Sequence, residues 1–514
     1  RLIAPRNGYA SMGVGLFGPK LTDIAATPLR LTGPGGVVLP PEAVQVRWIK
    51  DDRAFSATPV GGKQQYLSLS VHAGKDATPG VYTGSLNVSS EGFDGSLPVR
   101  LEVMPYVLPD PKDWRMLTGL IHSPDAIARQ YKVETWSDEH LKYMEPSLRL
   151  LRDIGSESCQ VFLIAEGLLN ERYSMVRRRA DGTPDFTGMD RYLDLWQRVC
   201  GQPRDITLYL WDSNAGTHGK QPWTPENSVK VTQVNADGKL ENIRAPYYGT
   251  PKAKAFWQPV FDGIRERLAK RGWQNTTVLL GVPWDAPPQD EVIDFLKEVA
   301  PGWRWRVFSH GYTIPLPKAD GKLIWGGGLE VGWLEFIGMP NPAWGGEGGR
   351  YVTMLRGAGM KRTYPETTCI RGYYQYRDLP TLCMLGGFQG YSQLGLDYWF
   401  SLAFSTGLGG NPRDGLIESI TKPGPNGAEP CIDYDLLREG LQAAAAYFQV
   451  RDHAPNVPAE VKTKAIDAAQ TFAATIFGRV VYGDQAARNQ NRWNAAVRDL
   501  YQVAGELQAV TPRK

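Results

Sequence analysis

Titratable residues follow a series of short apolar segments along this chain of 514 residues. Six carboxylates and two histidines hold these positions: His122, Glu166, Asp212, Asp285, His310, Glu330, Glu366 and Asp397. If the apolar segments are neighbouring parallel strands, their ends meet at one face and the acids gather there. Crowded carboxylates raise the pKa of some members, so a protonated acid can stand beside an ionised one. Such a pair suits cleavage of a glycosidic bond, where one carboxyl protonates the leaving group and another stabilises, attacks or activates water.

Four of these acids are the catalytic candidates: Asp285, Glu330, Asp397 and Glu366. Three residues separate Asp285 from Gln289, where the next helix is expected, so Asp285 is not a simple helix cap. Glu330 follows three glycines that let a substrate approach the backbone closely, and Trp333 nearby disfavours its ionised form, so Glu330 is the expected proton donor. A histidine beside a carboxylate could hold a metal, but such histidines more often make ordinary hydrogen bonds. No metal and no cofactor is therefore expected.

Tryptophan is abundant, with 16 residues beside 23 Tyr and 16 Phe. Most of these rings are expected to fill the core, but an exposed indole also stacks on the face of a sugar ring. The aromatic residues beside the strand-end acids are therefore candidates for substrate binding, together with the remaining strand-end groups. The substrate-binding candidates are His122, Glu166, Asp212, Trp284, His310, Trp333, Trp344, Tyr398 and Trp399.

The elements that must position these side chains fall into three regions. Residues 1–110 alternate apolar and polar positions, as in "YLSLSVHAG" (Tyr66–Gly74), with turn signals between the runs, which predicts an N-terminal β-sandwich. Residues 111–450 alternate apolar strands with amphipathic helices and predict a central (β/α)8 TIM-type barrel catalytic domain. Residues 451–514 predict a C-terminal helical region. The fold class is thus multidomain, β and α/β.

Eight strand candidates support the barrel, starting at Met116, Ser158, Asp205, Thr276, Arg304, Lys322, Met360 and Tyr391. A helix from Asp138 to Gly155 begins after an expected Ser137 N-cap, and "DYDLLREGLQAAAAYFQ" is expected to be the last barrel helix. The alternative is an open doubly wound sheet. That fold more often has a glycine-rich phosphate loop after its first strand, and this sequence has none there.

Composition narrows the choice of partners. The formal net charge is +3, with no basic stripe, so nucleic-acid binding is not expected. No apolar run is long enough to span a membrane. The five cysteines form no CxxC pair, which makes a metal cluster improbable. The sequence starts at Arg1, and a processed protein that is secreted or periplasmic is expected. The oligomeric state is left open.

Three stretches resemble glycoside hydrolase family 123 and its uncharacterised relatives. "PGVYTGSLNVSS" with "GSLPVRLEVMPYVLPDP" is similar to the β-sandwich that precedes their barrel, and "RNGYASMGV" is similar to their opening strand. "DYDLLREGLQ" resembles a helix with Arg-Glu-Gly late in those proteins. The resemblance implies a catalytic Asp-Glu pair before a proline after the fourth strand. There the Asp orients the acetamido group of an N-acetylhexosamine, and the Glu is the acid/base.

Asp285-Ala286-Pro287 occupies the matching place. The Asp is present, while alanine replaces the Glu, so the acid is expected from another strand end. The sequence thus predicts a glycoside hydrolase that acts on a glycan or polysaccharide with paired carboxylates. Two alternatives remain: a carbohydrate-binding barrel that has lost its acid/base, and a polysaccharide lyase that uses a Tyr and a His, for which "GYYQYRD" (372–378) is the candidate segment.

Overall fold

The structure, a computed structural model, describes residues 1–510 except for 22, 28, 51–54, 57, 60–61, 92, 168–169, 171, 212–227, 282–289, 310–328, 335–375, 382–383, 385–389, 400–418 and 482–489. The chain divides into two compact units. The first contains Arg1–Met116, Glu366–Leu385 and Pro430–Lys514, and the second contains Leu117–Pro365 and Gly386–Glu429. This division groups the chain differently from the three consecutive domains predicted from the sequence.

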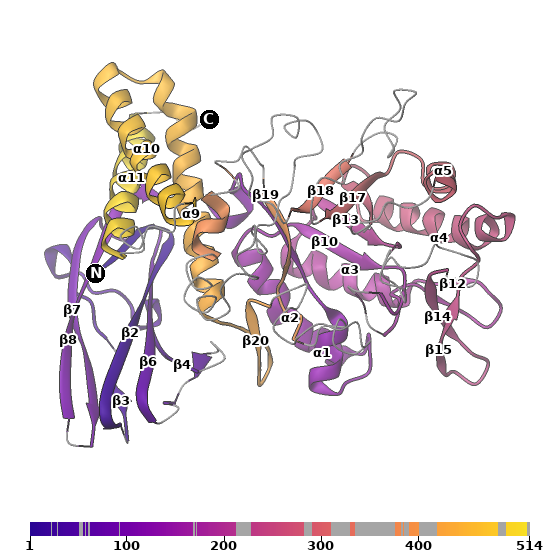
Figure 1. Ribbon diagram of the computed structural model, residues 1–514, viewed down its shortest axis with the longest axis horizontal. Coiled ribbons are helices and arrows are strands. Elements are labelled where there is room, and N and C mark those ends of the chain that lie inside the picture. Colours follow the sequence, from indigo (N-terminus) through magenta and orange to yellow (C-terminus); the bar gives the residue numbers. More distant parts are fainter. Residues whose placement is uncertain are drawn as a thin grey trace. The chain divides into compact units, whose positions relative to one another are not determined.

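Two four-stranded sheets build the N-terminal part of the first unit (Figure 1). One sheet has the order β1 (Leu2–Arg6), β8 (Phe93–Val107), β7 (Gly80–Ser90) and β3 (Ala25–Ala26). The other has the order β2 (Gly8–Leu21), β6 (Gly62–Ala73), β4 (Val44–Ile49) and β5 (Phe55–Ser56). Leu67, Leu69 and Val71 of β6 are fully buried in a core shared by both sheets, which confirms the alternation expected of this segment.

Three helices complete the first unit: α9 (Ile432–His453), α10 (Ala459–Val481) and α11 (Gln490–Val510). Glutamine side chains join two of these helices to the sheets. Each side-chain amide both donates a hydrogen bond to a strand residue and accepts one from it, as a backbone peptide group does. The amide of Gln442 on α9 accepts from Tyr9 N (2.6 Å) and donates to Tyr9 O (2.9 Å). The amide of Gln508 on α11 makes the same two bonds with Val107, at 2.9 and 2.8 Å. Each helix thereby satisfies a strand that would otherwise present unpaired backbone groups.

Helix α9 differs from its expected place. The sequence predicts it as the last barrel helix, whereas its contacts place it in the first unit with β2 and α11. It is buried along nearly its whole length, which weakens the helical periodicity that would mark one outward face. A sequence pattern of this kind identifies a buried helix without revealing which sheet it covers.

The Arg438-Glu439-Gly440 motif of α9 is structural. Arg438 lies over the ring of Tyr9, with its guanidinium carbon 3.5 Å from the ring centroid. Glu439 accepts hydrogen bonds from the backbone N and the hydroxyl of Ser11, both at 2.5 Å, and lies 3.7 Å from Arg377. Burial raises the pKa of Glu439 against the opposing effect of Arg377. All three contacts lie within the first unit, so the motif holds α9 to its surroundings.

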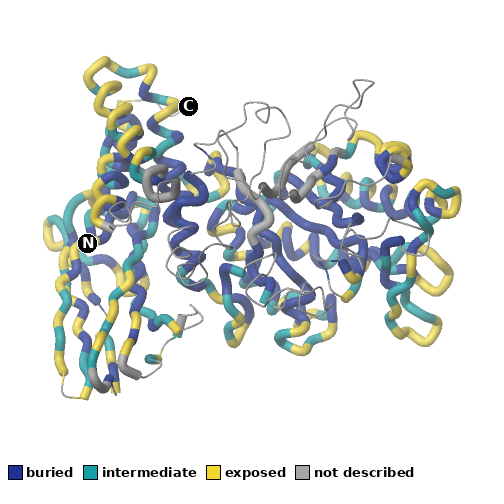
Figure 2. The backbone as a smooth tube through the Cα atoms, in the orientation of Figure 1, coloured by how far each residue is buried: buried dark blue, intermediate teal, exposed yellow. Residues whose placement is uncertain are grey.

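The second unit contains seven described parallel strands. Five form a sheet in the order β10 (Ser158–Phe162), β13 (Asp205–Tyr209), β16 (Thr277–Gly281), β17 (Arg304–Ser309) and β18 (Leu329–Leu334), and two form a pair, β9 (Leu117–Ile121) with β19 (Gly390–Gly395). A parallel bridge between Thr118 and Ser156 brings β9 beside the start of β10. The described strands β9, β10 and β13 are wholly buried, as expected for parallel strands covered on both faces (Figure 2).

Helices follow the strands: α1 (Pro124–Tyr131), α2 (Asp138–Asp153), α3 (Thr187–Cys200), α4 (Pro251–Lys270) and α5 (Asp290–Val299). Their starts follow from side-chain caps. The Ser137 hydroxyl accepts from His140 N at 3.1 Å, and Gly155 takes a φ of 66° just after the helix, which confirms both predicted ends of α2. Ser123 and Thr250 cap α1 and α4 in the same way, each with a proline at the next position.

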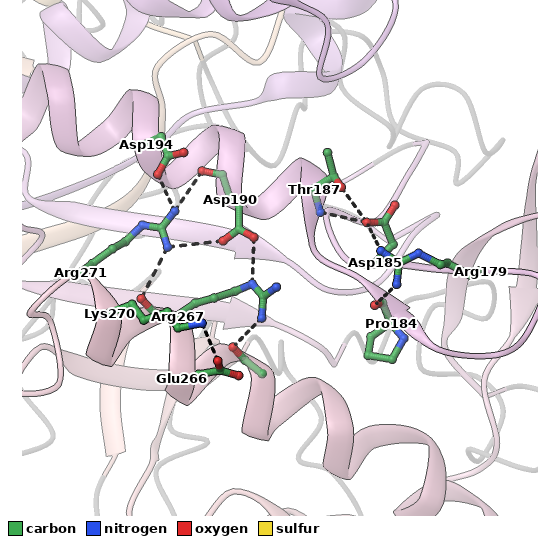
Figure 3. Close-up of polar contacts among 11 residues, drawn as sticks. Arg179, Pro184, Asp185, Thr187, Asp190, Asp194, Glu266, Arg267, Lys270 and Arg271 are labelled. Atoms are coloured by element: carbon green, nitrogen blue, oxygen red, sulfur yellow. Dashed lines mark hydrogen bonds and ion pairs between the residues drawn. The ribbon is translucent and has the colours of Figure 1, made fainter.

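Ion pairs tie α3 to α4 on the outside of this unit (Figure 3). The Asp190 carboxylate accepts from Arg267 at 2.8 Å and from Arg271 at 3.4 Å, and Arg271 also reaches Asp194 at 2.5 Å. Arg271 lies largely within the protein, with 12% of its side chain exposed. The network fixes two neighbouring helices against the sheet that they cover.

Short elements extend the two units. A small sheet of β12 (Pro184–Asp185), β11 (Arg177–Arg178), β14 (Lys230–Val234) and β15 (Leu240–Arg244) comes from the segments that follow β10 and β13. β20 (Thr421–Gly424) pairs with β21 (Gly427–Pro430), and short 3-10 turns cover Pro34–Gly36, Pro41–Ala43, Pro111–Asp113 and Ala454–Asn456. None of the helices in the described ranges has the length and apolar character needed to cross a bilayer.

Replacing Gly440 with alanine tests how closely α9 packs. A Cβ at this position would lie 2.2 Å from the backbone oxygen of Arg377, so the added methyl group must displace main chain. We expect a loss of about 1–3 kcal/mol in the free energy of unfolding, although alanine normally favours a helix over glycine. Urea unfolding measures it. Gly13→Ala on β2, where a Cβ would meet nothing within 4 Å, is the control, and equal stability of the two variants would contradict the packing argument.

Candidate functional site

The predicted site residues fall into two groups in the structure. Those outside the described residues are Asp212, Trp284, Asp285, His310, Trp344 and Glu366. Those inside the described ranges are His122, Glu166, Glu330, Trp333, Asp397, Tyr398 and Trp399. The geometry of the site is therefore built from the ends of β9, β10, β18 and β19.

Glu330 does not follow a strand, as the sequence predicted, but lies inside one. Strand β18 runs from Leu329 to Leu334, and Glu330 is paired in register with Arg306 of β17. Ser309, the last residue of β17, is paired with Leu334, so the two strands end level with each other. The acid that directly follows β18 in the sequence is Glu335. The three glycines before Leu329 carry no side-chain pattern, which is why the sequence did not fix where this strand begins.

His122 and Asp397 lie next to the first and last of the seven described parallel strands of the second unit. His122 follows β9 directly, and Asp397 comes two residues after β19. The Nδ1 atom of His122 lies 2.6 Å from Oδ2 of Asp397, and the backbone N of Ser123 donates to Oδ1 at 2.7 Å. Both side chains are buried, with 1% and 0% exposed. We name this contact the His122–Asp397 clasp.

Both oxygens of the Asp397 carboxyl group have a hydrogen-bond partner. Oδ1 accepts from the backbone N–H of Ser123, and Oδ2 lies within hydrogen-bond distance of His122 Nδ1. The imidazole ring stacks near Tyr192 of α3, with ring centroids 6.0 Å apart and planes 16° apart. Its Nε2 atom is buried and has no hydrogen-bond partner in the described part of the chain. A carboxylate with both oxygens occupied and no exposed surface favours a structural role for Asp397 over the catalytic role predicted for it.

The aromatic residues after β19 have different environments. Tyr398 is buried, with 7% exposed. Trp399 is half-buried, its indole N–H donates to Thr421 O at 3.1 Å, and its ring meets the edge of Tyr131 at a centroid distance of 6.3 Å. Among the four tryptophans predicted as sugar platforms, Trp399 is the one whose side chain the structure describes. Its partial exposure leaves this prediction open.

Glu166 sits in an exposed polar cluster on the segment after β10. Its carboxylate pairs with the ammonium group of Lys230 and accepts from Nδ2 of Asn242 at 3.0 Å. Burial raises the pKa of Glu166, but the hydrogen bonds from Lys230 and Asn242 outweigh it and leave the pKa below its usual value. We name Glu166, Lys230 and Asn242 the mouth cluster, because they lie on the segments that follow the carboxyl ends of β10 and β13.

The backbone at Glu166 is strained. Its φ of 56° lies in the left-handed region, which costs a residue with a Cβ about 1–2 kcal/mol. The ion pair to Lys230 leaves 41% and 32% of the two side chains exposed, and pairs of this kind contribute roughly 0–1 kcal/mol. The hydrogen bond from Asn242 is exposed as well, so the ion pair and this bond together do not offset the strain by a clear margin.

Sequence analysis missed Lys230 and Asn242. They lie on the hairpin β14–β15, whose strands are joined by the segment Asn235–Lys239 containing Asp-Gly. An Asp-Gly turn between two alternating runs is a hairpin signal, and it could have identified an insertion between the third and fourth parallel strands.

The part of the site that the structure describes offers no candidate metal site. Among the described residues, no group of three or more His, Cys, Asp or Glu side chains is arranged to hold a metal ion. The described cysteines Cys159 and Cys200 are free, and burial raises the pKa of both thiols. They therefore act as buried apolar groups.

Residues 122–310 match a family model for a glycoside hydrolase catalytic domain, which confirms the enzyme class predicted from the sequence. The model is that of glycoside hydrolase family 123, so the resemblance drawn from the sequence is confirmed as well. The matched segment begins at His122 of the clasp, contains Glu166 and Asp285, and ends directly after β17. No curated protein matches the chain.

Solved structures add evidence on the fold. A family 123 glycoside hydrolase from Clostridium perfringens, analysed for glycolipid glycan hydrolysis, is similar over 99% of this chain and 94% of its own, with a TM-score of 0.68 and 13% identity. A putative α-galactosidase/melibiase from Bacteroides fragilis (10% identity, 65% of this chain and 55% of that one, TM-score 0.19) and a β-glucuronidase from Parabacteroides merdae (12%, 56% and 34%, 0.18) are too distant to support an argument. The similarity to the Clostridium perfringens enzyme confirms a multidomain fold with β-sheets and helices.

Removing His122 tests the clasp. His122→Ala leaves the Asp397 carboxylate buried without its main partner, so we expect a loss of about 3–5 kcal/mol in the free energy of unfolding. His122→Asn keeps an N–H donor near the position of Nδ1 and should lose clearly less. Urea unfolding compares the two variants. An equal loss in both, or a loss below about 1 kcal/mol in the alanine variant, would show that the bond to Asp397 is not what matters.

The acid stability of the second unit depends on His140. Its Nε2 lies 2.9 Å from Pro124 O, its Nδ1 accepts from Trp136 N at 3.0 Å, and burial lowers its pKa from 6.5 to about 4. Between pH 6.5 and pH 4 this histidine is protonated in the unfolded chain and neutral in the folded chain. The free energy of unfolding therefore falls as the pH falls from 6.5 to 4. The expected contribution is about 3 kcal/mol. Denaturation curves across this range measure it, and a His140→Gln variant with an unchanged pH dependence would refute the assignment.

Proposed function

We propose that this protein cleaves a glycosidic bond of a glycan at the mouth of a closed (β/α)8 barrel. The match of residues 122–310 to a glycoside hydrolase catalytic domain carries the proposal. Seven parallel strands and the helices that alternate with them support the barrel, as does the pairing of β9, the first of these strands along the chain, with β19, the last, beside which the clasp forms. In this proposal the eighth strand comes from the segment between β18 and β19, and the two N-terminal sheets and the C-terminal helices are accessory parts.

The catalytic acids proposed here are Asp285 and Glu335. Asp285 follows β16 by four residues and keeps the place of the family aspartate, so we assign it the orienting or charge-stabilising role. Because Glu330 lies inside β18, level with Arg306, the acid that follows this strand is the better proton donor. Glu335 therefore replaces Glu330 as the first choice, and Glu366 is the next one to test. The donor protonates the leaving oxygen while a second group compensates the developing positive charge on the sugar.

The substrate class is proposed from the similar enzyme. The similar enzyme from Clostridium perfringens was analysed for glycolipid glycan hydrolysis, so glycolipid glycans belong in the first substrate panel together with polysaccharide fragments. We further propose that the protein works outside the cytoplasm, where such glycans occur. Detection of the native protein in secreted or periplasmic fractions of its host would test this.

A carbohydrate-binding barrel without catalysis is the second candidate. Ala286 favours it, because the family acid/base is missing from that position. The described part of the lyase candidate segment does not favour that alternative, and residues 372–375 of the segment lie outside the described residues. Tyr376 and Arg377 of the segment are buried in the first unit, where Arg377 packs on Trp493 with its guanidinium carbon 4.3 Å from the ring centroid.

Substrate leaving-group dependence tests the proton donor. Glu335→Gln should slow cleavage of a natural glycan by about 10²–10⁴-fold, because proton transfer to the leaving oxygen is lost. Aryl glycosides with acidic leaving groups need little protonation and should slow far less. The measurement is kcat on both substrate types for the wild type, Glu335→Gln and Glu330→Gln.

Glu298→Gln is the matched control, because Glu298 forms an exposed pair with Lys254 between α4 and α5. It should keep wild-type rates. If Glu330→Gln instead shows the leaving-group signature and Glu335→Gln does not, the donor is Glu330. If the wild type binds glycans of the panel and cleaves none, the binding-barrel candidate replaces the enzyme.

A further inference from the structure

Glu166 keeps a strained backbone without a matching gain in stability. A glycine would adopt its φ of 56° without steric cost, and the exposed ion pair to Lys230 does not require this particular backbone conformation. Strain that the surrounding contacts do not repay is typical of residues held for binding or catalysis. The observation points to a use for the carboxylate itself.

The mouth cluster presents a fixed set of hydrogen-bonding groups. The Asn242 amide is held at both ends, since its Oδ1 accepts from the Thr232 hydroxyl at 2.9 Å and its Nδ2 donates to Arg172 O at 2.7 Å. Thr232 in turn accepts from Ser174 N at 2.8 Å. Asn242 therefore holds Glu166 in place through a chain of hydrogen bonds that runs from the exposed carboxylate to the buried backbone N of Ser174, and the carboxylate is aligned before any ligand arrives.

Counted over the described residues, free hydrogen-bonding capacity remains on the exposed side of the mouth cluster. A carboxylate has about four lone-pair sites, and Glu166 uses one on each oxygen for Lys230 and Asn242. The Lys230 ammonium has three N–H donors and uses one for Glu166. A partly exposed acceptor beside a partly exposed donor matches two adjacent hydroxyl groups of a sugar, one donating to the carboxylate and the other accepting from the ammonium.

The position of the cluster agrees with this chemistry. Glu166 follows β10 by four residues, and Ala165 forms a bridge to Lys230 in the insertion after β13. Both segments leave the sheet at the carboxyl ends of parallel strands, the side at which barrel enzymes bind substrate. We propose that Glu166 and Lys230 form a sugar-binding subsite that recognises a vicinal diol of the glycan. This assignment rests on the proposed function, which it extends by naming the recognised chemical group.

Direct binding tests the subsite separately from catalysis. The probes are methyl hexopyranosides and analogues that lack one of two adjacent hydroxyls, and binding to the full-length protein is followed by saturation-transfer NMR. Glu166→Gly accommodates the backbone conformation and removes the carboxylate, while Lys230→Met removes the ammonium and leaves the backbone unchanged. Glu298→Gln is the matched surface control.

We expect Glu166→Gly and Lys230→Met to weaken binding about tenfold or more, as for a lost hydrogen bond to a charged group. Glu166→Gly should keep a melting temperature within about 2 °C of the wild type or above it. Deoxygenated probes should bind the wild type as weakly as the intact probes bind the variants. With a cleaved substrate, KM should rise by the same factor while kcat changes less than about twofold.

Three results would overturn the proposal. The first is a wild type that binds none of the methyl glycosides. The second is a Glu166→Gly variant that binds within twofold of the wild type, which would make the cluster a tether between loops. The third result applies if Glu166→Gly fails to fold: in that case, a Lys230→Met variant that binds the probes as tightly as the wild type overturns the proposal. A wild type that binds in this way and cleaves no glycoside would refute the proposed function and leave the subsite standing.

Discussion

The His122–Asp397 clasp is the contact on which the second unit depends most. A set of parallel strands is stable only when its edges are paired or covered, because open edges leave backbone groups without partners. The clasp links residues 275 positions apart, next to the first and last of the seven described parallel strands, which also pair with each other. The buried Asp397 carboxyl group is satisfied by a ring nitrogen and a backbone N–H, so breaking either bond leaves a polar group without a partner away from water.

The sequence predicted local elements well and their partners poorly. The alternation of "YLSLSVHAG" and the caps of α2 depend on neighbours within a few residues, and the structure confirms both. The pairing of His122 with Asp397 depends on closure over hundreds of residues, so both appeared only as polar groups after strands. Burial decides whether such a group faces a substrate or the core, and no local pattern separates the two cases.

Glu330 and Glu166 show how the site was predicted in part. The glycines before Leu329 gave no periodic signal, so the strand was predicted to end near Glu330, before its observed end at Leu334. Glu335 was interpreted only as a loop neighbour of Glu330. Glu166 was identified as a mouth residue, but its strained backbone and its partners Lys230 and Asn242 became visible only with coordinates. Positive φ at a residue with a Cβ is a property of the fold around it, since the side chain itself disfavours that conformation.

The order in which the first unit can form follows from its discontinuous sequence. Tyr9 finds its partner Gln442 only 433 residues later, and Arg1 O accepts from Asn494. At about 5–20 residues per second, a ribosome needs roughly 20–90 seconds to bridge the first of these gaps. The N-terminal strands therefore leave the ribosome long before the helices that cover them. The backbone groups that later bond to those helices, such as those of Tyr9, have no helix partner while the second unit is synthesised. Translation speed and chaperone access, in addition to sequence, set the yield of folded protein.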